Sequence, residues 1–230
     1  MRDLEKYRGV IPAFYACYDE NGEISGERTE ALALHFLKKG VKGLYVNGSS
    51  GECIYQSVED RKKVLEHVMK AVGGKLTIIA HVACNNTKDS VELAAHAEKL
   101  GVDAIAAIPP IYFHLPDHAI AEYWNDISAA APHTDFVIYN IPQLAGVALS
   151  PSLFRKMREN PNVIGVKNSS SFNSLVRNPI FFRTPFGSVT ILLPSIRASP
   201  LSGLISVANM RSVVVFPAPF GPNNPKTSPL

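Results

Sequence analysis

Apolar runs of strand length alternate with amphipathic stretches of helical length through the first 170 residues of the chain. Apolar residues that recur at helical spacing predict helices, whereas short continuous apolar runs predict strands that are covered on both faces. The pattern predicts six strands, at residues 9–15, 43–46, 76–82, 104–108, 136–141 and 163–166. Between them it predicts five helices, at residues 27–39, 58–72, 88–100, 118–130 and 151–159.

The spacing of these strands indicates repeated strand–helix units. Successive strands begin 27 to 34 residues apart, which accommodates a strand, a crossover helix and two short loops. Helix-start signals agree with this division, because Ser57 and Asp60 form a capping-box pattern and Thr87 and Ser150 are expected to cap helices. The first 170 residues are therefore predicted to form a parallel α/β sheet.

Such a sheet is either open and doubly wound or closed into an eight-stranded barrel. An open nucleotide-binding sheet normally carries a glycine fingerprint after its first strand, but here that strand runs into AFYACYDENG. Polar residues instead follow several strands, as expected where the loops after barrel strands build an active site. We therefore predict a (β/α)8 TIM barrel, with six of its units accounted for.

The composition changes abruptly near Ser170. Residues 1–170 hold 18 Lys and Arg and all 20 Asp and Glu, whereas residues 171–230 hold five Lys and Arg, no acidic residue and nine of the 17 prolines. The runs 189–193 and 213–216 are strand candidates, but the sequence between them favours no helix. We expect residues 1–170 to form barrel units one to six, and residues 171–230 to be an atypical Pro- and Ser-rich tail, which leaves the barrel incomplete or aberrant after the sixth strand.

Several protein classes are excluded by composition. A hydrophobic content of 46% with a net charge of +3 argues against disorder, and no apolar run reaches the roughly 18–20 residues that a membrane helix needs. The charged start MRDLEKYRG lacks a signal core, so a cytoplasmic location is expected, and no basic cluster indicates nucleic acid. Cys17, Cys53 and Cys84 have no metal-binding spacing, and we interpret them, with the strand residue His81, as core residues.

Two side chains at strand ends are suited to carbonyl chemistry. Lys167 ends the apolar run VIGVK, where burial disfavours the ammonium form and leaves an amine that can form a Schiff base with a keto group. Tyr139 lies in YNIP after the preceding strand, where its hydroxyl could relay a proton. From these residues alone, a lysine that reaches out to water and a core tyrosine remain open interpretations.

Two further motifs follow strands. Ser49 and Ser50, between glycines in GSSGE, could present hydroxyl and backbone donors to a carboxylate, although small Ser/Gly turns are common. Tyr112, in PPIYFHLP, is either a site residue or a packing aromatic.

Together, the motifs GLYVNGSSGE, IIAHVACN, PPIYFHLP, YNIPQLAGV and VIGVKNSS, in this order within residues 8–170, resemble the N-acetylneuraminate lyase and dihydrodipicolinate synthase superfamily. The resemblance implies a pyruvate-dependent class I aldolase on a (β/α)8 barrel that acts on a small-molecule substrate, needs no metal or organic cofactor and commonly forms a homotetramer. It favours the lyase branch, because YNIPQLAGV lacks the arginine that follows the corresponding motif of synthases.

The resemblance also implies the chemical roles. Lys167 is similar to the lysine that binds pyruvate as a Schiff base, and Tyr139 to the tyrosine that moves the proton of the substrate hydroxyl. The implied reaction is the reversible cleavage of N-acetylneuraminate to N-acetylmannosamine and pyruvate. The alternatives are another 2-keto-acid aldolase, a dihydrodipicolinate synthase-like enzyme, or a truncated non-catalytic fragment, because the tail lacks the acidic segment that binds sugar hydroxyls in the lyase branch.

Binding roles follow from the same resemblance. Ser49 and Ser50 match the pair that binds the keto-acid carboxylate, and Ser169 aligns with a hydroxyl residue that contacts the sugar. Tyr112 resembles a second tyrosine that reaches into the site of a neighbouring subunit.

Overall fold

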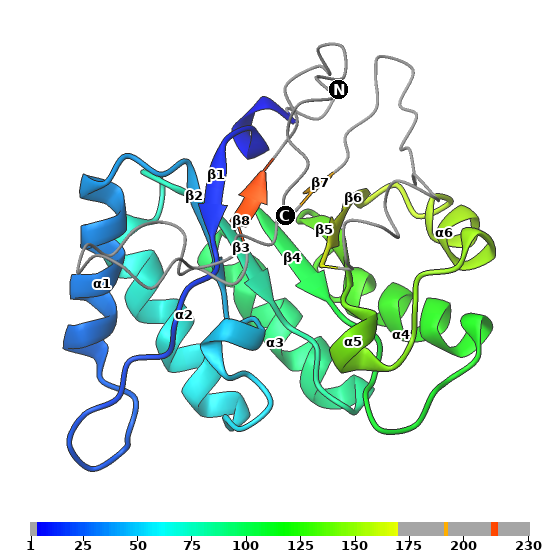
Figure 1. Cartoon of the computed structure of the whole chain (residues 1–230), viewed down its shortest axis with the longest axis horizontal. Coiled ribbons are helices and arrows are strands. Elements are labelled where there is room, and N and C mark those ends of the chain that lie inside the picture. The colour runs from blue at the N-terminus through cyan, green and yellow to red at the C-terminus, as the bar shows by residue number, and fades with distance from the viewer. Residues whose placement is uncertain (1–3, 170–190, 193–212, 216–230) are drawn as a thin grey trace, which may run out of the picture.

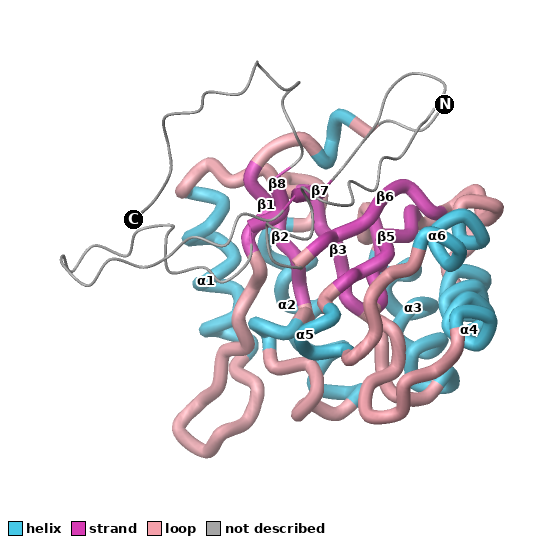
Figure 2. Tube along the Cα trace, turned by 45° about the vertical axis from the view of Figure 1, so that its right-hand side comes forward, coloured by secondary structure: helices cyan, strands magenta, loops and turns pink. Residues whose placement is uncertain are grey.

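The computed structural model describes residues 4–169, 191–192 and 213–215 of the chain. Its strands form one sheet, and the larger helices lie along the outside of that sheet (Figures 1 and 2). The strands are β1 (Val10–Pro12), β2 (Gly43–Val46), β3 (Thr77–His81), β4 (Ala104–Ala107), β5 (Asp135–Asn140), β6 (Val163–Asn168), β7 (Ile191–Leu192) and β8 (Val213–Val215). The helices are α1 (Gly26–Lys38), α2 (Val58–Val72), α3 (Thr87–Leu100), α4 (Asp117–Ala129), α5 (Pro142–Ala145) and α6 (Pro151–Met157), with 3₁₀ turns η1 (Glu5–Tyr7) and η2 (Ser49–Gly51).

The sheet closes on itself through β1. Strands β2 to β6 pair in parallel, each with the next, as the strand spacing predicts. A parallel bridge between Ala13 and Tyr45 joins the chain after β1 to β2, and the Phe14 N–H donates to the Tyr45 carbonyl at 2.8 Å. On the other side, β6 pairs with β7, and the short β8 lies between β7 and β1. The prediction of a barrel-type α/β fold is confirmed.

The part after the sixth strand is atypical, as expected. Strand β8 is antiparallel to both β7 and β1, whereas all strands of a regular (β/α)8 barrel are parallel. The short strands β7 and β8 correspond to the predicted runs 189–193 and 213–216, and the rest of those runs lies outside the described residues. The division of the chain into two parts at residue 170 stays a prediction.

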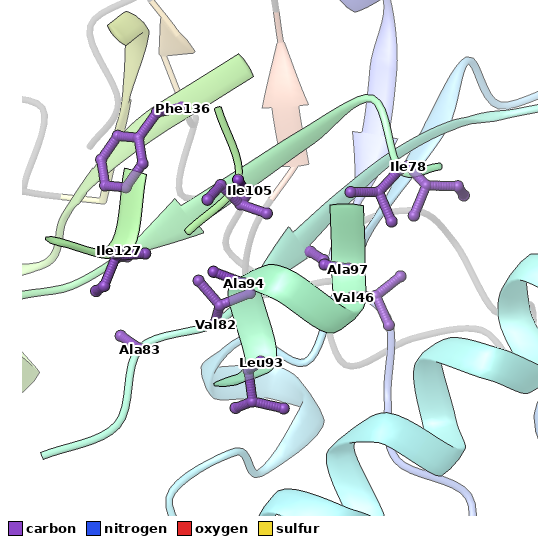
Figure 3. Packing of buried hydrophobic residues seen from close by; sticks show 14 of the residues in the cluster. Val46, Ile78, Val82, Ala83, Leu93, Ala94, Ala97, Ile105, Ile127 and Phe136 are labelled. Carbon is purple, nitrogen blue, oxygen red and sulfur yellow. The ribbon is translucent and has the colours of Figure 1, made fainter. Parts of the chain in front are cut away.

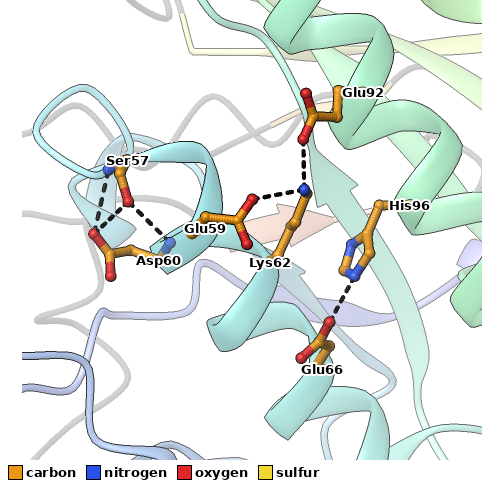
Figure 4. A network of polar contacts seen from close by, with 7 residues as sticks. All are labelled: Ser57, Glu59, Asp60, Lys62, Glu66, Glu92 and His96. Carbon is orange, nitrogen blue, oxygen red and sulfur yellow. Dashed lines mark hydrogen bonds and ion pairs between the residues drawn. The ribbon is translucent and has the colours of Figure 1, made fainter.

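Helix starts follow the local sequence closely. The Ser57 hydroxyl accepts the Asp60 N–H at 3.1 Å while the Asp60 carboxylate accepts the Ser57 N–H at 3.4 Å, which forms the predicted capping box of α2 (Figure 4). The prediction that Thr87 caps α3 is wrong by one residue. Asn86 is the cap, because its side-chain oxygen accepts the Asp89 N–H at 2.8 Å and Thr87 is already helical. Within the described ranges, no helix is long and apolar enough to span a membrane.

Ion pairs link α2 to its neighbour α3 at the surface (Figure 4). The Lys62 ammonium lies 2.8 Å from Glu59 and 2.5 Å from Glu92, and the His96 ring lies 2.8 Å from Glu66. Exposed pairs of this kind contribute little to stability, so the attachment of the helices rests mainly on apolar packing.

Alternation along the strands separates two apolar layers. Side chains on the outer face pack against the helices, and Figure 3 shows strand residues such as Val46, Ile78 and Phe136 near Leu93 and Ile127 of α3 and α4. The neighbouring strand positions point into the barrel, because successive side chains alternate between faces. This interior cluster consists of Tyr7, Ile11, Tyr45, Ile79, Ala104, Ala106, Val137 and Tyr139.

A polar group of residues closes the barrel at the amino ends of its strands. The buried Tyr7 of η1 places its hydroxyl 2.8 Å from the Asp135 carboxylate and 2.6 Å from the Asp103 carbonyl. Lys6 lies 3.2 Å from the Asp103 carboxylate and 3.7 Å from that of Asp135. We call Lys6, Tyr7, Asp103 and Asp135 the basal cluster. It ties the chain before β1 to β4 and β5.

Candidate active site

Lys167 and Tyr139 face each other at the carboxyl ends of two neighbouring strands. They are directly paired in the parallel register of β6 and β5. Both are buried, and the Lys167 Nζ atom lies 3.4 Å from the centroid of the Tyr139 ring and 4.7 Å from that of Tyr45. The structure therefore brings together the two residues that the sequence selects for carbonyl chemistry.

The surroundings of Lys167 favour its neutral amine. Its side chain is 1% exposed, and among the described residues Nζ donates one hydrogen bond, to the Ser169 hydroxyl at 3.3 Å, and forms no ion pair. Burial holds the pKa of Lys167 well below its ordinary value of 10.5, because the ammonium loses its hydration. A larger fraction of the amine is then unprotonated near neutral pH, and the unprotonated amine is the nucleophile that forms Schiff bases.

Tyr139 keeps its proton. Burial raises the pKa of the phenol, and the nearby hydroxyl side chains of Ser49 and Ser169 partly offset that effect. Ser169 also accepts the hydrogen bond from the Lys167 amine, so it lies near both groups. A protonated phenol beside an amine and hydroxyl groups can donate a proton to an oxygen or, after losing it, accept one.

The loop after β2 is shaped to bring its serines to this point. Asn47 adopts a left-handed conformation, with φ of 59°, which asparagine tolerates better than most residues. At Gly48 a Cβ atom would lie 2.6 Å from the Tyr45 ring, so only glycine lets the loop pass this close. The next residues form η2, where Ser49 and Ser50 are half-buried side by side. The structure places Ser49 near the Tyr139 phenol, and Ser50 follows Ser49 in η2.

Ser169 is positioned by the end of the β5–β6 ladder. Its N–H donates to the Asn140 carbonyl at 2.8 Å. The Asn140 amide donates to Asn168 at 3.0 Å and accepts the Leu149 N–H at 3.0 Å. The strand end is thus fixed from both sides, which holds the Ser169 hydroxyl near Lys167.

Tyr112 lies apart from these residues in the single chain. Its side chain is 86% exposed, and its ring stacks edge-to-face on Phe113 with centroids 5.0 Å apart. Its φ of 78° is unusual for a tyrosine. No contact between Tyr112 and Lys167 exists among the described residues, so its predicted role across a subunit boundary stays a prediction.

Two residues near the lysine were not selected by the sequence. Tyr45 and His81 are each 1% exposed, and their rings pack edge-to-face on Tyr139 at centroid distances of 5.5 and 5.9 Å. The prediction that His81 is a buried strand residue is confirmed, but it lies beside the candidate site. We call Tyr45, His81, Tyr139 and Lys167 the lysine cluster.

Protein side chains alone make up this cluster. In the described part of the chain, no group of three or more His, Cys, Asp or Glu residues could hold a metal ion. The thiols of Cys17, Cys53 and Cys84 are free and half-buried, so their interpretation as core residues is only partly right. What the geometry offers is a buried amine, a protonated phenol and adjacent hydroxyl groups.

Comparison with known proteins agrees with this arrangement. Residues 6–179 match the Dihydrodipicolinate synthetase family. The chain belongs to this family. The match includes every residue of the lysine cluster and extends nine residues beyond the point where the sequence motifs end.

Within the Dihydrodipicolinate synthetase family, the chain is similar to sialic acid lyases. It is 79% identical over 170 residues, 74% of this chain and 54% of the relative, to an N-acetylneuraminate lyase of Mediterraneibacter gnavus. It is 35% identical over 163 residues, 71% of this chain and 55% of the relative, to an N-acetylneuraminate lyase of Escherichia coli strain SMS-3-5. The structure of a catalytic lysine mutant of the Ruminococcus gnavus sialic acid aldolase is 79% identical with a TM-score of 0.73, covering 74% of this chain and 56% of that one.

The chain thus spans about half the length of the curated relatives that it matches. The family match, residues 6–179, contains the first six strands, and with them both Lys167 and Tyr139.

Proposed function

We propose that this chain is a pyruvate-dependent class I aldolase that reversibly cleaves N-acetylneuraminate to N-acetylmannosamine and pyruvate. The observation that carries the proposal is the buried Lys167 amine opposite the Tyr139 ring, in a chain 79% identical over 170 residues to an N-acetylneuraminate lyase. The Ruminococcus gnavus aldolase, similar at the same level, has a catalytic lysine.

In the proposed reaction the Lys167 amine attacks the keto carbon of the open-chain substrate. A bond forms between nitrogen and that carbon, and the keto oxygen leaves as water. Tyr139 gives its proton to the departing keto oxygen. The resulting protonated imine accepts the electron pair of the carbon–carbon bond that breaks, while the Tyr139 phenolate takes the proton of the substrate hydroxyl. The enamine is then protonated, and water hydrolyses the imine to release pyruvate. Side chains supply all of this chemistry, so the proposal needs no metal or organic cofactor.

Binding roles complete the proposal. The Ser49 and Ser50 loop holds the keto-acid carboxylate, and Ser169 contacts the sugar part of the substrate. We also propose a homotetramer in which Tyr112 approaches the site of a neighbouring subunit. The large exposed fraction of Tyr112 supports this role, since an aromatic ring in water gains by being covered. A cytoplasmic location and a role in carbohydrate metabolism belong to the same proposal.

Two observations favour a second candidate, a folded chain that does not turn over substrate. The chain spans 54% of the length of its 79%-identical relative. Strand β8 also joins β1 in the antiparallel sense, which a regular barrel does not have. A site that lacks groups from the rest of the barrel could bind pyruvate without cleaving the sugar acid.

A measurement of the released products distinguishes the active aldolase from a folded chain without turnover. The purified chain is incubated with N-acetylneuraminate, and pyruvate and N-acetylmannosamine are quantified over time. Parallel reactions test other 2-keto-acid aldols, and pyruvate with aspartate semialdehyde. Lys167→Met, which keeps the length of the side chain and removes the amine, is the control. The proposal expects equal amounts of both products from N-acetylneuraminate with the parent and none with the variant. Turnover of another substrate alone, or equal rates in parent and variant, would contradict it.

A further inference from the structure

Two buried polar atoms in the lysine cluster have no hydrogen-bond partner among the described residues. They are the Tyr45 hydroxyl and the Nε2 atom of His81. Both side chains are 1% exposed, and their rings lie 6.3 Å apart between centroids. Buried polar groups are nearly always paired, and an unpaired one commonly marks a bound water or ligand. Here two neighbouring rings of the lysine cluster each carry an unpaired polar atom.

The hydrogen bonds of His81 indicate that Nε2 is an acceptor. Nδ1 lies 3.0 Å from the carbonyl oxygen of Asn47, which can only accept, so the proton of a neutral ring is on Nδ1. Arg61 also approaches Nδ1, at 3.4 Å, but its guanidinium is a donor and is better placed on the His81 carbonyl, at 2.7 Å. The lone pair of Nε2 is therefore available inside the barrel.

The groups around His81 keep its ring neutral. It faces Arg61, Lys167, Tyr45, Tyr139 and the Asn47 carbonyl. Burial lowers the pKa of His81 well below its ordinary value and the charge of Arg61 lowers it further, whereas the hydrogen bond with the Asn47 carbonyl acts in the opposite direction. Arg61 is itself 1% exposed and is held by the carbonyls of Ala83 and His81. The acceptor is thus fixed in place and in protonation state.

We propose that the Tyr45 hydroxyl and His81 Nε2 form a subsite for one water molecule at a time: the water that leaves when the Lys167 imine forms, and the solvent water that adds when the imine is hydrolysed. The inference rests on the proposed function. The centroid of the Tyr45 ring lies 4.7 Å from Lys167 Nζ, so this residue is a close neighbour of the amine that forms the imine. Tyr45 donates to the oxygen, and Nε2 accepts one of its protons in a hydrogen bond. Both are positioning residues for that water.

The step balances without a further reactant. In imine formation, a bond from Nζ to the keto carbon forms, the carbon–oxygen bond breaks, and the oxygen leaves with two protons as water. In hydrolysis a solvent water that has replaced the departed one in the subsite adds to the imine carbon, and the nitrogen–carbon bond breaks. A subsite that holds the water stabilises the transition state of both directions equally. It therefore changes the rates of imine formation and hydrolysis but not the amount of imine at equilibrium.

Oxygen exchange measures this directly. Pyruvate labelled with oxygen-18 at its keto group loses the label each time an imine forms and is hydrolysed. The exchange rate catalysed by the parent is compared with that of Tyr45→Phe and of His81→Asn, whose amide can still donate to Asn47. Uncatalysed exchange is subtracted with Lys167→Met. The end point of borohydride trapping with pyruvate is measured on the same samples.

The matched control is Tyr123→Phe, which removes another buried hydroxyl. That hydroxyl lies 2.7 Å from the Cys84 carbonyl and 2.9 Å from Ser90, in the outer apolar layer away from Lys167. We expect Tyr45→Phe and His81→Asn to slow exchange about tenfold, the effect of losing one hydrogen bond in the transition state, with an unchanged trapping end point. Tyr123→Phe should melt at a lower temperature and exchange at the parent rate, whereas Tyr45→Phe should melt no lower than the parent.

Three results would overturn the inference. Parent-like exchange in folded Tyr45→Phe and His81→Asn would remove the subsite while leaving the proposed function intact. Parent-like exchange combined with slower cleavage of N-acetylneuraminate would assign the two atoms to a substrate hydroxyl instead of water. If the parent itself neither exchanges label nor traps pyruvate, the proposed function fails and the inference fails with it.

Discussion

The two ends of the barrel interior hold polar clusters of opposite character. In the basal cluster, the Tyr7 hydroxyl meets Asp135, and Lys6 lies between Asp103 and Asp135. In the lysine cluster, Lys167 has no carboxylate partner among the described residues, and the Tyr45 hydroxyl and His81 Nε2 are unpaired there. Strand β5 belongs to both clusters, with Asp135 at its amino end and Tyr139 near its carboxyl end.

This difference indicates that the basal cluster stabilises the fold, whereas the lysine cluster carries the chemistry. A paired buried hydrogen bond stabilises a fold by about 0.5–1.5 kcal/mol, whereas a buried polar group without a partner costs about 1–3 kcal/mol. Selection for stability alone would therefore disfavour the unpaired groups at the carboxyl ends. They are explained if they act on a ligand, since sites built for reaction are commonly less stable than the fold could be.

The largest effect is expected from Tyr139→Phe, which tests whether the lysine cluster carries the chemistry. Removing the phenol oxygen should slow cleavage of N-acetylneuraminate by about 10²–10⁴-fold, the usual range for a general acid–base group. Pyruvate should still be trapped by borohydride, because the amine of Lys167 remains. Steady-state kinetics and trapping on the same preparation measure both effects. An unchanged cleavage rate would exclude Tyr139 as the proton carrier.

The next effect is expected at the other end, from Tyr7→Phe. The loss of the hydroxyl leaves the buried Asp135 carboxylate without that donor, so the free energy of unfolding should fall by about 1–3 kcal/mol. The rate of pyruvate trapping should stay at the parent value, since Tyr7 lies at the opposite ends of the strands. Denaturant unfolding and trapping rates test this pair of outcomes. A variant as stable as the parent with slower trapping would contradict the view that the basal cluster stabilises the fold without taking part in the chemistry.

A smaller effect should appear in the pH dependence of stability. The pKa of Lys167 is lower in the folded chain than its ordinary value of 10.5, so between the two values the unfolded chain binds more protons. The free energy of unfolding of the parent should therefore rise with pH in this window relative to Lys167→Met, by at most about 1.4 kcal/mol per pH unit. Below the folded-state pKa the difference between the two proteins should be constant. Parallel unfolding curves of both proteins from neutral to alkaline pH measure it, and a difference that falls with rising pH would contradict the buried amine.

Much of this fold follows from local sequence. Strand β2 occupies its predicted range without change, and Ser57 caps α2 as expected. Lys167 and Tyr139 could be selected because they end apolar runs of successive strands, and the carboxyl ends of parallel neighbours lie side by side.

Tyr45 and His81 could not be selected in this way. Parallel strands covered on both faces read as continuous apolar runs, so GLYV and TIIAH do not reveal which positions point into the barrel. Only closure of the sheet shows that both rings face Tyr139. Likewise, the contact of Tyr7 with Asp135 joins residues 128 positions apart, and the antiparallel direction of β8 depends on how the sheet closes.

Trapping with borohydride is the most direct test of whether Lys167 forms a Schiff base with pyruvate. The purified chain is incubated with pyruvate, reduced, and examined by intact mass and peptide mapping. We expect one reduced pyruvyl adduct, located on Lys167, in protein that melts cooperatively. A cooperatively folded chain that gives no adduct, or an adduct on a different lysine, would contradict it.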